Sequence, residues 1–432
     1  MNFGQSTRSQ IDQIRSFSRP ARLYMLAVLI DGISYCGWSL FFNFYILGRG
    51  FDKGFLGLVN ALPAIGILVF GIPMGRLSDR IGRRPAMIIG ATLAIISMCL
   101  QVVLRAPLLI LLAAFTTGAA SSLYTLSQAP FMMKASTPQN RDLLFSLNFG
   151  LITISGAVGS AFAGQLPGFL GWLLHISATS ALTYRWALLT SLAFSMLLVV
   201  PLILIKEPQS KTHTARTSQK QDSLWKVIGH PVTLKLALPN LLIGLGASIL
   251  VPYVNLFYAE RFAMPAQVLG VLFSFAALLT GIGSFIGPRL AVHLGSKIRT
   301  VVYTQASSLL FLLIMGFSPI ASLSAVGFLV RGTLMNMALP LLDAFSMEQV
   351  EEGQQGTVNS VRNMTLQLGW AIGPFLSGLV QEHYGFPPLF AATCLLYGVS
   401  TWLTWLFFHK KGSQPRADAA LGEILPAEAL DN

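Results

Sequence analysis

Charged residues are scarce in this sequence. Of its 432 residues only 11% are Asp, Glu, Lys or Arg, whereas 53% are hydrophobic. A soluble globular protein carries about 25% charged residues. A chain with so little charge cannot cover a water-facing surface of its size. We therefore predict an integral membrane protein, with the lipid bilayer as its main surrounding.

Cysteine and metal-binding patterns are also sparse. The three cysteines, Cys36, Cys99 and Cys394, lie within apolar runs and form no CxxC pair. They should behave as small packed hydrophobic side chains. The histidines have no metal-ligand spacing, and a Gly-Lys-Ser/Thr phosphate loop does not occur. No Ser-His-Asp arrangement is evident either. We expect no metal, no cofactor and no enzymatic activity.

Long apolar runs are what the chain does contain. A run of ~20 apolar residues matches a helix across a ~30 Å hydrocarbon core. Within lipid, only a helix or a closed barrel satisfies its own backbone hydrogen bonds. We predict an all-α membrane protein with twelve transmembrane helices at residues 23–47, 54–75, 85–104, 108–133, 143–166, 184–205, 234–258, 268–291, 300–317, 320–345, 358–380 and 386–408.

One long polar interruption divides these runs into two sets of six. Residues 206–230 are rich in Lys, Gln, Ser and Thr, which is typical of a linker. We predict a cytoplasmic linker there, between an N-terminal six-helix bundle at 23–205 and a C-terminal one at 231–409. Residues 1–22 are expected to be a cytoplasmic N-terminal segment, and 410–432 a disordered cytoplasmic tail.

The net charge of +12 indicates membrane topology rather than nucleic-acid binding. We assign 23 of the 29 lysines and arginines to one side of the membrane. Because Lys and Arg accumulate in short cytoplasmic loops, both termini are expected in the cytoplasm of a multi-pass protein of the cell (inner or plasma) membrane. Five basic residues fall on the other side: Arg49, Lys53, Arg105, Arg185 and Arg261.

The segment from Gly75 to Arg84 reads G-R-L-S-D-R-I-G-R-R and separates the second and third runs. Two glycines allow the helix ends to approach closely, and Asp79 can accept hydrogen bonds from the arginines. We predict a tight basic hairpin that begins at Gly75. A basic loop alone would explain the arginines but not the glycines and the aspartate.

This segment resembles the loop 2–3 signature of the major facilitator superfamily, G-x-L-x-D-R-x-G-R-R/K. The resemblance covers residues 23–408. It implies two six-helix bundles with pseudo-two-fold symmetry, and a secondary transporter that works by alternating access. It also implies that the loop acts as a cytoplasmic gate, with Asp79 near the start of the 358–380 helix. The gate residues are Gly75, Asp79, Arg80, Gly82, Arg83 and Arg84.

Weak internal repeats support two related halves. Gly164 corresponds to Gly378 at an offset of 214 residues, and Asn43 corresponds to Asn255 at an offset of 212. The signature itself recurs in degenerate form at 288–297. Matches in corresponding spans at nearly one offset are the pattern that a duplicated transporter produces.

An acidic residue inside the first span begins a stripe at helical spacing. Asp31, Tyr35, Trp38 and Phe42 share one face. A charge at the bilayer centre costs about 2.5–3.5 kcal/mol, so this face should line a central cavity. Asp31 could exchange a proton there, as first-span acids often do in the resembled superfamily. Alternatively, a buried donor holds Asp31 permanently and the pair fastens helices together.

A basic residue inside the tenth span is the second candidate. Arg331 corresponds by the repeat to Thr117 in the fourth span, so it should face the same cavity. It could bind an anionic group or balance Asp31, or it could pair with helix carbonyls or with Asp343. Other candidate cavity residues, each of which could instead join helices, are Thr117, Ser121, Tyr124, Gln128, Asn240, Asn255, Gln367 and Trp370.

These features favour proton-coupled export of small organic compounds, such as drugs or metabolites, by a monomer. The aromatic face beside Asp31 motivates this prediction. Drug–proton antiporters of the resembled superfamily carry a Gly/Pro-rich signature in the fifth span, but here Ser160 replaces the expected proline. Proton-coupled uptake of a polar or anionic metabolite is the alternative, with Arg331 as its anchor. A non-transporting membrane sensor or scaffold is the alternative from another class.

Overall fold

Short polar side chains and one glycine set where several helices begin and end. The computed structural model describes residues 17–137, 140–206, 230–350 and 354–409. Ser18, Asp52, Ser180 and Ser296 each precede a helix and accept a hydrogen bond from a backbone N–H in its first turn. These caps satisfy donors that the helix leaves free. Gly82 has φ 96°, so it ends one helix and begins the next.

The first half of the chain forms six spans. The sixth is interrupted by a short 3₁₀ turn at Met196–Leu198. In chain order the helices are α2 (Arg19–Gly48), α3 (Lys53–Ile81), α4 (Arg83–Val103), α5 (Pro107–Ala135), α6 (Arg141–Leu174), and α7 (Ala181–Ser195) with α8 (Val199–Leu204).

The second half forms six more spans, and its first is interrupted by a 3₁₀ turn at Val251–Tyr253. Eleven spans in the described part are long and apolar enough to cross a membrane; α15 is the more polar twelfth. The predicted twelve-helix fold is confirmed. The helices are α10 (Pro231–Leu250) with α11 (Val254–Phe262), α12 (Ala266–His293), α13 (Lys297–Phe317), α14 (Ala321–Glu348), α15 (Gln355–Tyr384) and α16 (Pro387–Phe408).

The hairpin predicted to begin at Gly75 is wrong in its extent. Helix α3 continues through the motif to Ile81, and Gly82 alone separates it from α4. No residue between Gly75 and Gly82 breaks a helix, so the chain stays helical until a positive φ is required. The predicted linker and both predicted terminal segments fall largely outside the described residues.

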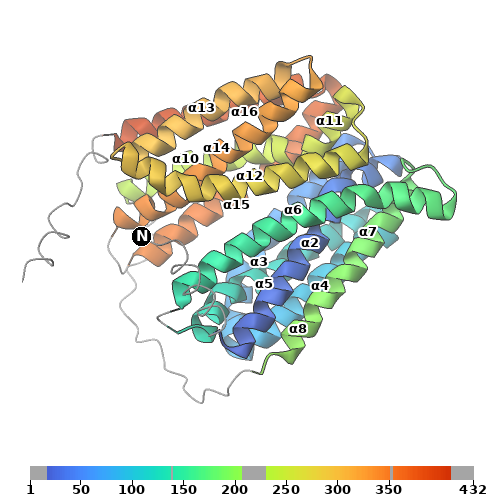
Figure 1. Cartoon of the computed structure of the whole chain (residues 1–432), viewed down its shortest axis with the longest axis horizontal. Helices are drawn as coiled ribbons and strands as arrows, with labels where there is room; N and C mark the ends of the chain where they lie inside the picture. The colour runs from blue at the N-terminus through green and yellow to red at the C-terminus, as the bar shows by residue number, and fades with distance from the viewer. Residues whose placement is uncertain (1–16, 138–139, 207–229, 351–353, 410–432) are drawn as a thin grey trace, which may run out of the picture.

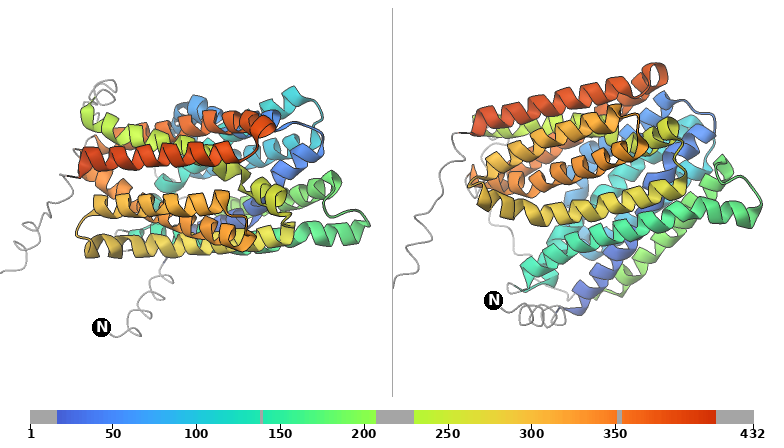
Figure 2. Two further views of the ribbon diagram at one scale, coloured as in Figure 1. Left: turned by 90° about the horizontal axis from the view of Figure 1, so that it is seen from above. Right: turned by 45° about the horizontal axis from the view of Figure 1, so that its top comes forward.

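The two halves lie side by side and meet mainly along two helix pairs. Helix α3 packs against α15 and α6 against α12, and α2 makes smaller contacts with α11 and α12. In Figure 1 the first half lies below the second, and α6 and α12 converge toward one end and diverge toward the other. Figure 2 shows the same roughly parallel bundle from two more directions. We name the convergent end the Lys53 end and the divergent end the Gly82 end.

Two pairs of glycines make the closest approaches between the halves. Gly57 of α3 meets Gly378 of α15, and Gly164 of α6 meets Gly270 of α12. A β-carbon on Gly57 would lie 2.5 Å from a carbonyl oxygen of α15, and one on Gly270 would lie 2.6 Å from a carbonyl oxygen of α6. The two crossings are related by the internal repeat, and neither has room for a larger residue.

Candidate functional site

Two asparagines join the halves at the centre of the Lys53 end. The Asn43 amide donates to Asn255 Oδ1 at 2.9 Å and to the Pro252 carbonyl at 2.6 Å. In return Asn255 donates to the Leu40 carbonyl at 2.8 Å. Both side chains are buried, where an unpaired amide would be costly. Residues related by the repeat thus contact each other, which places them at the pseudo-two-fold axis.

The 3₁₀ turn between α10 and α11 supplies part of this closure. Pro252 has no N–H to donate and interrupts the regular helix. Its carbonyl accepts the hydrogen bond from Asn43. The sequence pattern proposed Asn255 as a cavity-lining residue, and the structure places it in the contact that closes one end of the space between the halves.

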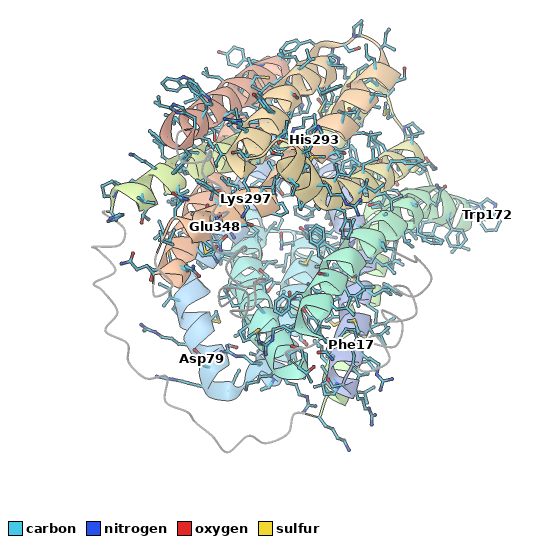
Figure 3. All side chains as sticks on the ribbon, turned by 60° about the vertical axis from the view of Figure 1, so that its left-hand side comes forward. Phe17, Asp79, Trp172, His293, Lys297 and Glu348 are labelled. Carbon is cyan, nitrogen blue, oxygen red and sulfur yellow. The ribbon has the colours of Figure 1, made fainter. Side chains whose placement is uncertain are left out.

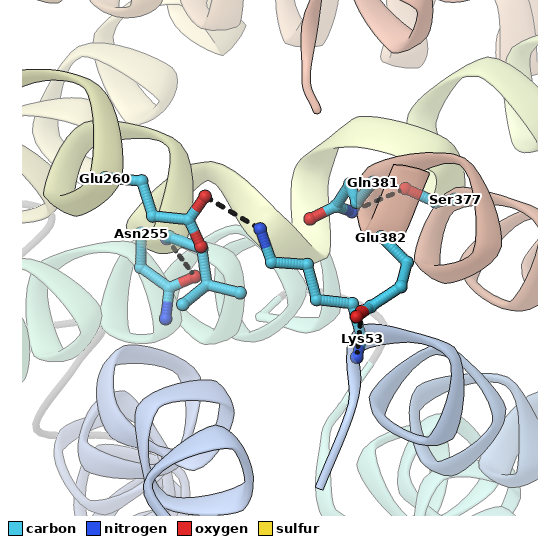
Figure 4. A network of polar contacts seen from close by, with 7 residues as sticks. Lys53, Asn255, Glu260, Ser377, Gln381 and Glu382 are labelled. Atoms are coloured by element: carbon cyan, nitrogen blue, oxygen red, sulfur yellow. Dashed lines mark hydrogen bonds and ion pairs between the residues drawn. The ribbon is translucent and has the colours of Figure 1, made fainter. Parts of the chain in front are cut away.

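Lys53 makes a second connection beside the asparagines. Its ammonium donates to Glu260 Oε2 of α11 at 2.8 Å, and its backbone N–H donates to Glu382 Oε2 of α15 at 2.8 Å. Figure 4 shows both contacts, with Asn255 beside Glu260. One residue of the first half therefore engages two helices of the second half.

At the Gly82 end, the described ion pairs stay within one half. Asp79 pairs with Arg83 of the same motif, and Lys297 pairs with Glu348. Figure 3 shows Asp79 well separated from Lys297 and Glu348. Asp79 pairs with its neighbour in the motif rather than with the start of α15. The halves are thus joined at the Lys53 end and apart at the Gly82 end.

The other motif residues hold α3, α4 and the end of α8 together. Arg83 also donates to the Ser78 hydroxyl at 2.8 Å. Arg84 reaches across to α8 and donates to the Leu202 and Ile203 carbonyls. Arg80 is exposed. Gly75 has no close neighbour apart from the edge of a leucine of α5.

Asp31 and Tyr35 lie on the Gly82 side of the asparagine contact. Tyr35 and Asn43 are eight residues apart and therefore share a face of α2, and Asn43 faces the second half. The Tyr35 side chain is 58% exposed although it lies in mid-helix, so it borders the space between the halves. Asp31 lies one turn further, and its carboxyl is beside the Tyr124 hydroxyl of α5.

The Tyr124 hydroxyl is buried and reaches no hydrogen-bond geometry with any described residue. It lies close to the amide of Gln128 as well as to Asp31. A phenol between a carboxyl and an amide can donate a hydrogen bond to the carboxylate or accept one from its acid form. The structure therefore brings together three of the residues that the sequence proposed.

The remaining proposed residues of α2 and α5 have packing contacts. Trp38 stacks on Phe42 with ring centroids 4.1 Å apart, and Phe42 is buried. Thr117 accepts a hydrogen bond from Gln101 of α4 at 2.9 Å, so it faces a neighbouring helix. The Ser121 hydroxyl bonds a carbonyl of its own helix.

Arg331 lies between helices of the second half. Its guanidinium donates to the Tyr397 hydroxyl of α16 at 2.7 Å and also lies over that ring. The side chain is 7% exposed, and its Nε has no partner among the described residues. Asp343, which the sequence offered as a partner, instead binds Arg362 at 2.8 Å. Arg331 therefore connects α14 to α16.

The proposed residues of α10 and α15 lie within the second half or are partly buried. Asn240 of α10 donates to the Arg362 carbonyl of α15 at 2.6 Å. Gln367 and Trp370 are partly buried. The sequence analysis did not propose Lys53, Glu260 or Glu382 as site residues. A charged residue at the end of a span is expected there whatever its partners, so its position in the sequence does not indicate a contact.

Comparison with known proteins decides the family. The model of the Major Facilitator Superfamily matches residues 27–374 and 236–429. This chain belongs to the Major Facilitator Superfamily. It is a multi-pass membrane transporter, and the family moves small molecules rather than catalysing reactions.

Relatives within the family are distant. The tetracycline resistance protein, class B, of Escherichia coli is 25% identical over 344 residues, which cover 76% of this chain and 79% of that protein. The uncharacterized MFS-type transporter YuxJ of Bacillus subtilis is 25% identical over 280 residues, or 64% of this chain and 68% of that protein.

Solved structures show the same fold at lower identity. A bacterial homolog of the human lysosomal transporter Spinster, inward-facing and unoccupied, has a TM-score of 0.70 at 14% identity and covers 91% of this chain and 95% of that one. A single-residue mutant of the nucleoside transporter NupG has a TM-score of 0.71 at 16% identity, with 91% of this chain and 99% of that one covered.

Proposed function

We propose that this transporter exports small organic compounds in exchange for protons. The observation that carries the proposal is the Asp31 carboxyl beside the buried Tyr124 hydroxyl, one turn from the exposed Tyr35 ring. A carboxyl within a span is rare unless it lines an aqueous path or relays protons. The aromatic surface beside it suits partly apolar compounds, and one relative is named for drug resistance.

The transport cycle follows from the two unlike ends. We assign the Gly82 end to the cytoplasmic side of a plasma membrane, because most basic residues of the sequence fall at that end. A compound entering from that side meets the closed contact of Asn43 with Asn255. Binding of the compound displaces the Asp31 proton into the cytoplasm, and the loaded carrier opens that contact. Protonation of Asp31 from outside releases the compound and favours the return to the state open at the Gly82 end, so that one proton moves inward as one compound moves outward.

Reconstituted vesicles test the coupling. Asp31→Asn should abolish substrate-driven proton flux, because the amide cannot exchange a proton. Glu348→Gln, which removes a carboxylate from an exposed ion pair, should keep it. A wild-type rate in Asp31→Asn vesicles would rule out this carboxyl as the coupling site. Absence of any flux in wild type, across a broad compound screen, would point to a non-transporting protein.

Uptake of a polar metabolite is the second candidate, because α15 is more polar than the other eleven spans. An outward substrate gradient should drive proton uptake for an exporter, and an inward gradient should drive proton entry for a symporter. Arg331→Gln separates two roles for that residue. If only transport of anionic substrates is lost, Arg331 binds the substrate anion. If all transport is lost, its role is the structural contact with Tyr397.

A further inference from the structure

A cavity of about 520 Å³ lies between the halves at the Lys53 end. The first half contributes Phe44, Leu47 and Tyr184, and the second half contributes Leu256, Glu260 and Met264. The cavity borders the crossing of α6 and α12. It is separate from the space that Tyr35 borders, because the Asn43 contact lies between them along α2.

The repeat explains why a cavity fits at this crossing. At the crossing of α3 and α15, Lys53 extends from the first residue of α3 to Glu260. The equivalent position at the crossing of α6 and α12 is Ala266, the first residue of α12, which lines the cavity. The small side chain of Ala266 leaves empty the volume that the Lys53 side chain fills at the crossing of α3 and α15.

The lining of the cavity selects for one charge. Its walls are mainly apolar, and Phe44 and Tyr184 stack with centroids 5.4 Å apart. Glu260 is the one charged residue among the lining residues, and its side chain is 41% exposed. Its Oε2 binds Lys53, while Oε1 has no hydrogen bond within the described part of the chain. A cavity of this volume falls in the ~300–1,000 Å³ range of small-molecule sites.

We propose that this cavity is a second ligand site, which binds an organic cation with an apolar body. The aromatic faces favour a cation, and so does the Glu260 Oε1, which the ion pair of Oε2 with Lys53 leaves without a hydrogen bond in the described part of the chain. Because the walls come from both halves, bound cation stabilises the state that is closed at the Lys53 end. The site thus holds the transporter in one state, whatever its transported substrate and direction.

Binding of tetraphenylphosphonium to purified protein in detergent tests the charge preference. Tetraphenylborate has nearly the same shape and the opposite charge. The phosphonium should raise the temperature of thermal unfolding, and the borate should not. Glu260→Gln should weaken phosphonium binding by about tenfold or more. Glu382→Gln, whose carboxylate also contacts Lys53 but does not line the cavity, should leave affinity within about twofold. Equal affinities in the two variants would overturn the proposal.

A filling variant tests the location. Ala259 lines the cavity, whereas Ala321 begins α14 at the same end outside the lining. Ala259→Trp should abolish phosphonium binding and Ala321→Trp should preserve it. Binding that survives Ala259→Trp but is lost in Asp31→Asn would place the cation in the space that Tyr35 borders instead, and would overturn the proposal.

A backbone variant tests the dependence on conformation. Gly378→Ala disfavours the α3–α15 contact without touching the cavity lining. It should weaken phosphonium binding, because fewer molecules are closed at the Lys53 end. Gly71→Ala lies in the same interface helix, α3, with no neighbour within 4 Å, and should leave binding unchanged. Unchanged affinity in Gly378→Ala would remove the claim that the site is specific to the closed state.

Discussion

At the scale of the residue, closure of the Lys53 end depends on the side chains of Asn43 and Asn255. Their amide groups have most of their hydrogen-bonding atoms paired. Asn60 donates to Asn43 Oδ1 at 3.2 Å, while the Asn43 amide group is bound by Pro252 and Asn255. A buried polar group that loses its partner costs more than the hydrogen bond contributes when made. This asymmetry makes the pair sensitive to single substitutions.

Asn43→Ala should destabilise the closed state by removing both bonds to the second half. The expected cost is about 1–3 kcal/mol, measured as a lower temperature of thermal unfolding. A second measure is faster labelling of Ser39→Cys from the Lys53 side, since Ser39 lies one turn before Asn43 on α2 and its carbonyl accepts from Asn255. Asn336→Ala is the control, since Asn336 donates only to a carbonyl of its own helix. Equal effects in the two variants would contradict a cross-half role.

Tyr397→Phe should destabilise the second half because it removes the described hydrogen-bond acceptor of a buried guanidinium. Hydrogen bonds to charged groups contribute about 1.5–3 kcal/mol. Arg331→Met together with Tyr397→Phe should recover part of that loss, since neither polar group then remains. Thermal unfolding of the single and double variants measures the coupling. Additive losses would contradict the contact between Arg331 and Tyr397.

At the scale of the element, the glycine crossings let α3 and α6 approach their partners backbone to backbone. A β-carbon on Gly378 would overlap the Lys53 carbonyl, and a backbone cannot turn aside as a flexible side chain can. The same substitution has no such cost in the state that is open at the Lys53 end. The crossings therefore influence the balance between states as well as stability.

Gly378→Ala should shift the population toward the state that is open at the Lys53 end. Cysteine labelling at position 39 from that side should be several-fold faster than in the parent. Gly71→Ala is the matched control, because it adds a methyl group where no atom lies within 4 Å and improves helix propensity by about 1 kcal/mol. Slower labelling in Gly378→Ala would contradict the crossing as a determinant of closure.

At the scale of the whole molecule, the observed state is joined at one end and separated at the other. The motif residue Asp79 pairs with Arg83, and both belong to the same half. In alternating access the opposite end must close for transport to proceed. We expect Asp79 to act in that second state.

Asp79→Asn should impair transport in vesicles and leave thermal stability nearly unchanged. An exposed ion pair between residues four apart contributes only about 0.3–0.5 kcal/mol. Glu348→Gln removes the matching exposed pair of the second half and serves as control. If Asp79→Asn transports at the wild-type rate, the motif aspartate has no part in closing the Gly82 end.

Much of the fold could be predicted from the order of residues along the chain. Hydrocarbon imposes the same demand on every span, so each apolar run indicates a helix without reference to its neighbours. Gly82 and the basic residues around it indicate a turn and a side of the membrane. The predicted turn was too long, because a helix continues until a residue ends it, and no residue before Gly82 does so.

The candidate site was predictable only in part. Asp31 is conspicuous in the sequence because a charge in an apolar run is costly wherever it lies. The contacts of Arg331 with Tyr397 and of Lys53 with Glu260 could not be anticipated, since their partners are 66 and 207 residues away. Helical periodicity gives the residues that share a face, but the helix opposite that face is set by packing among all twelve spans.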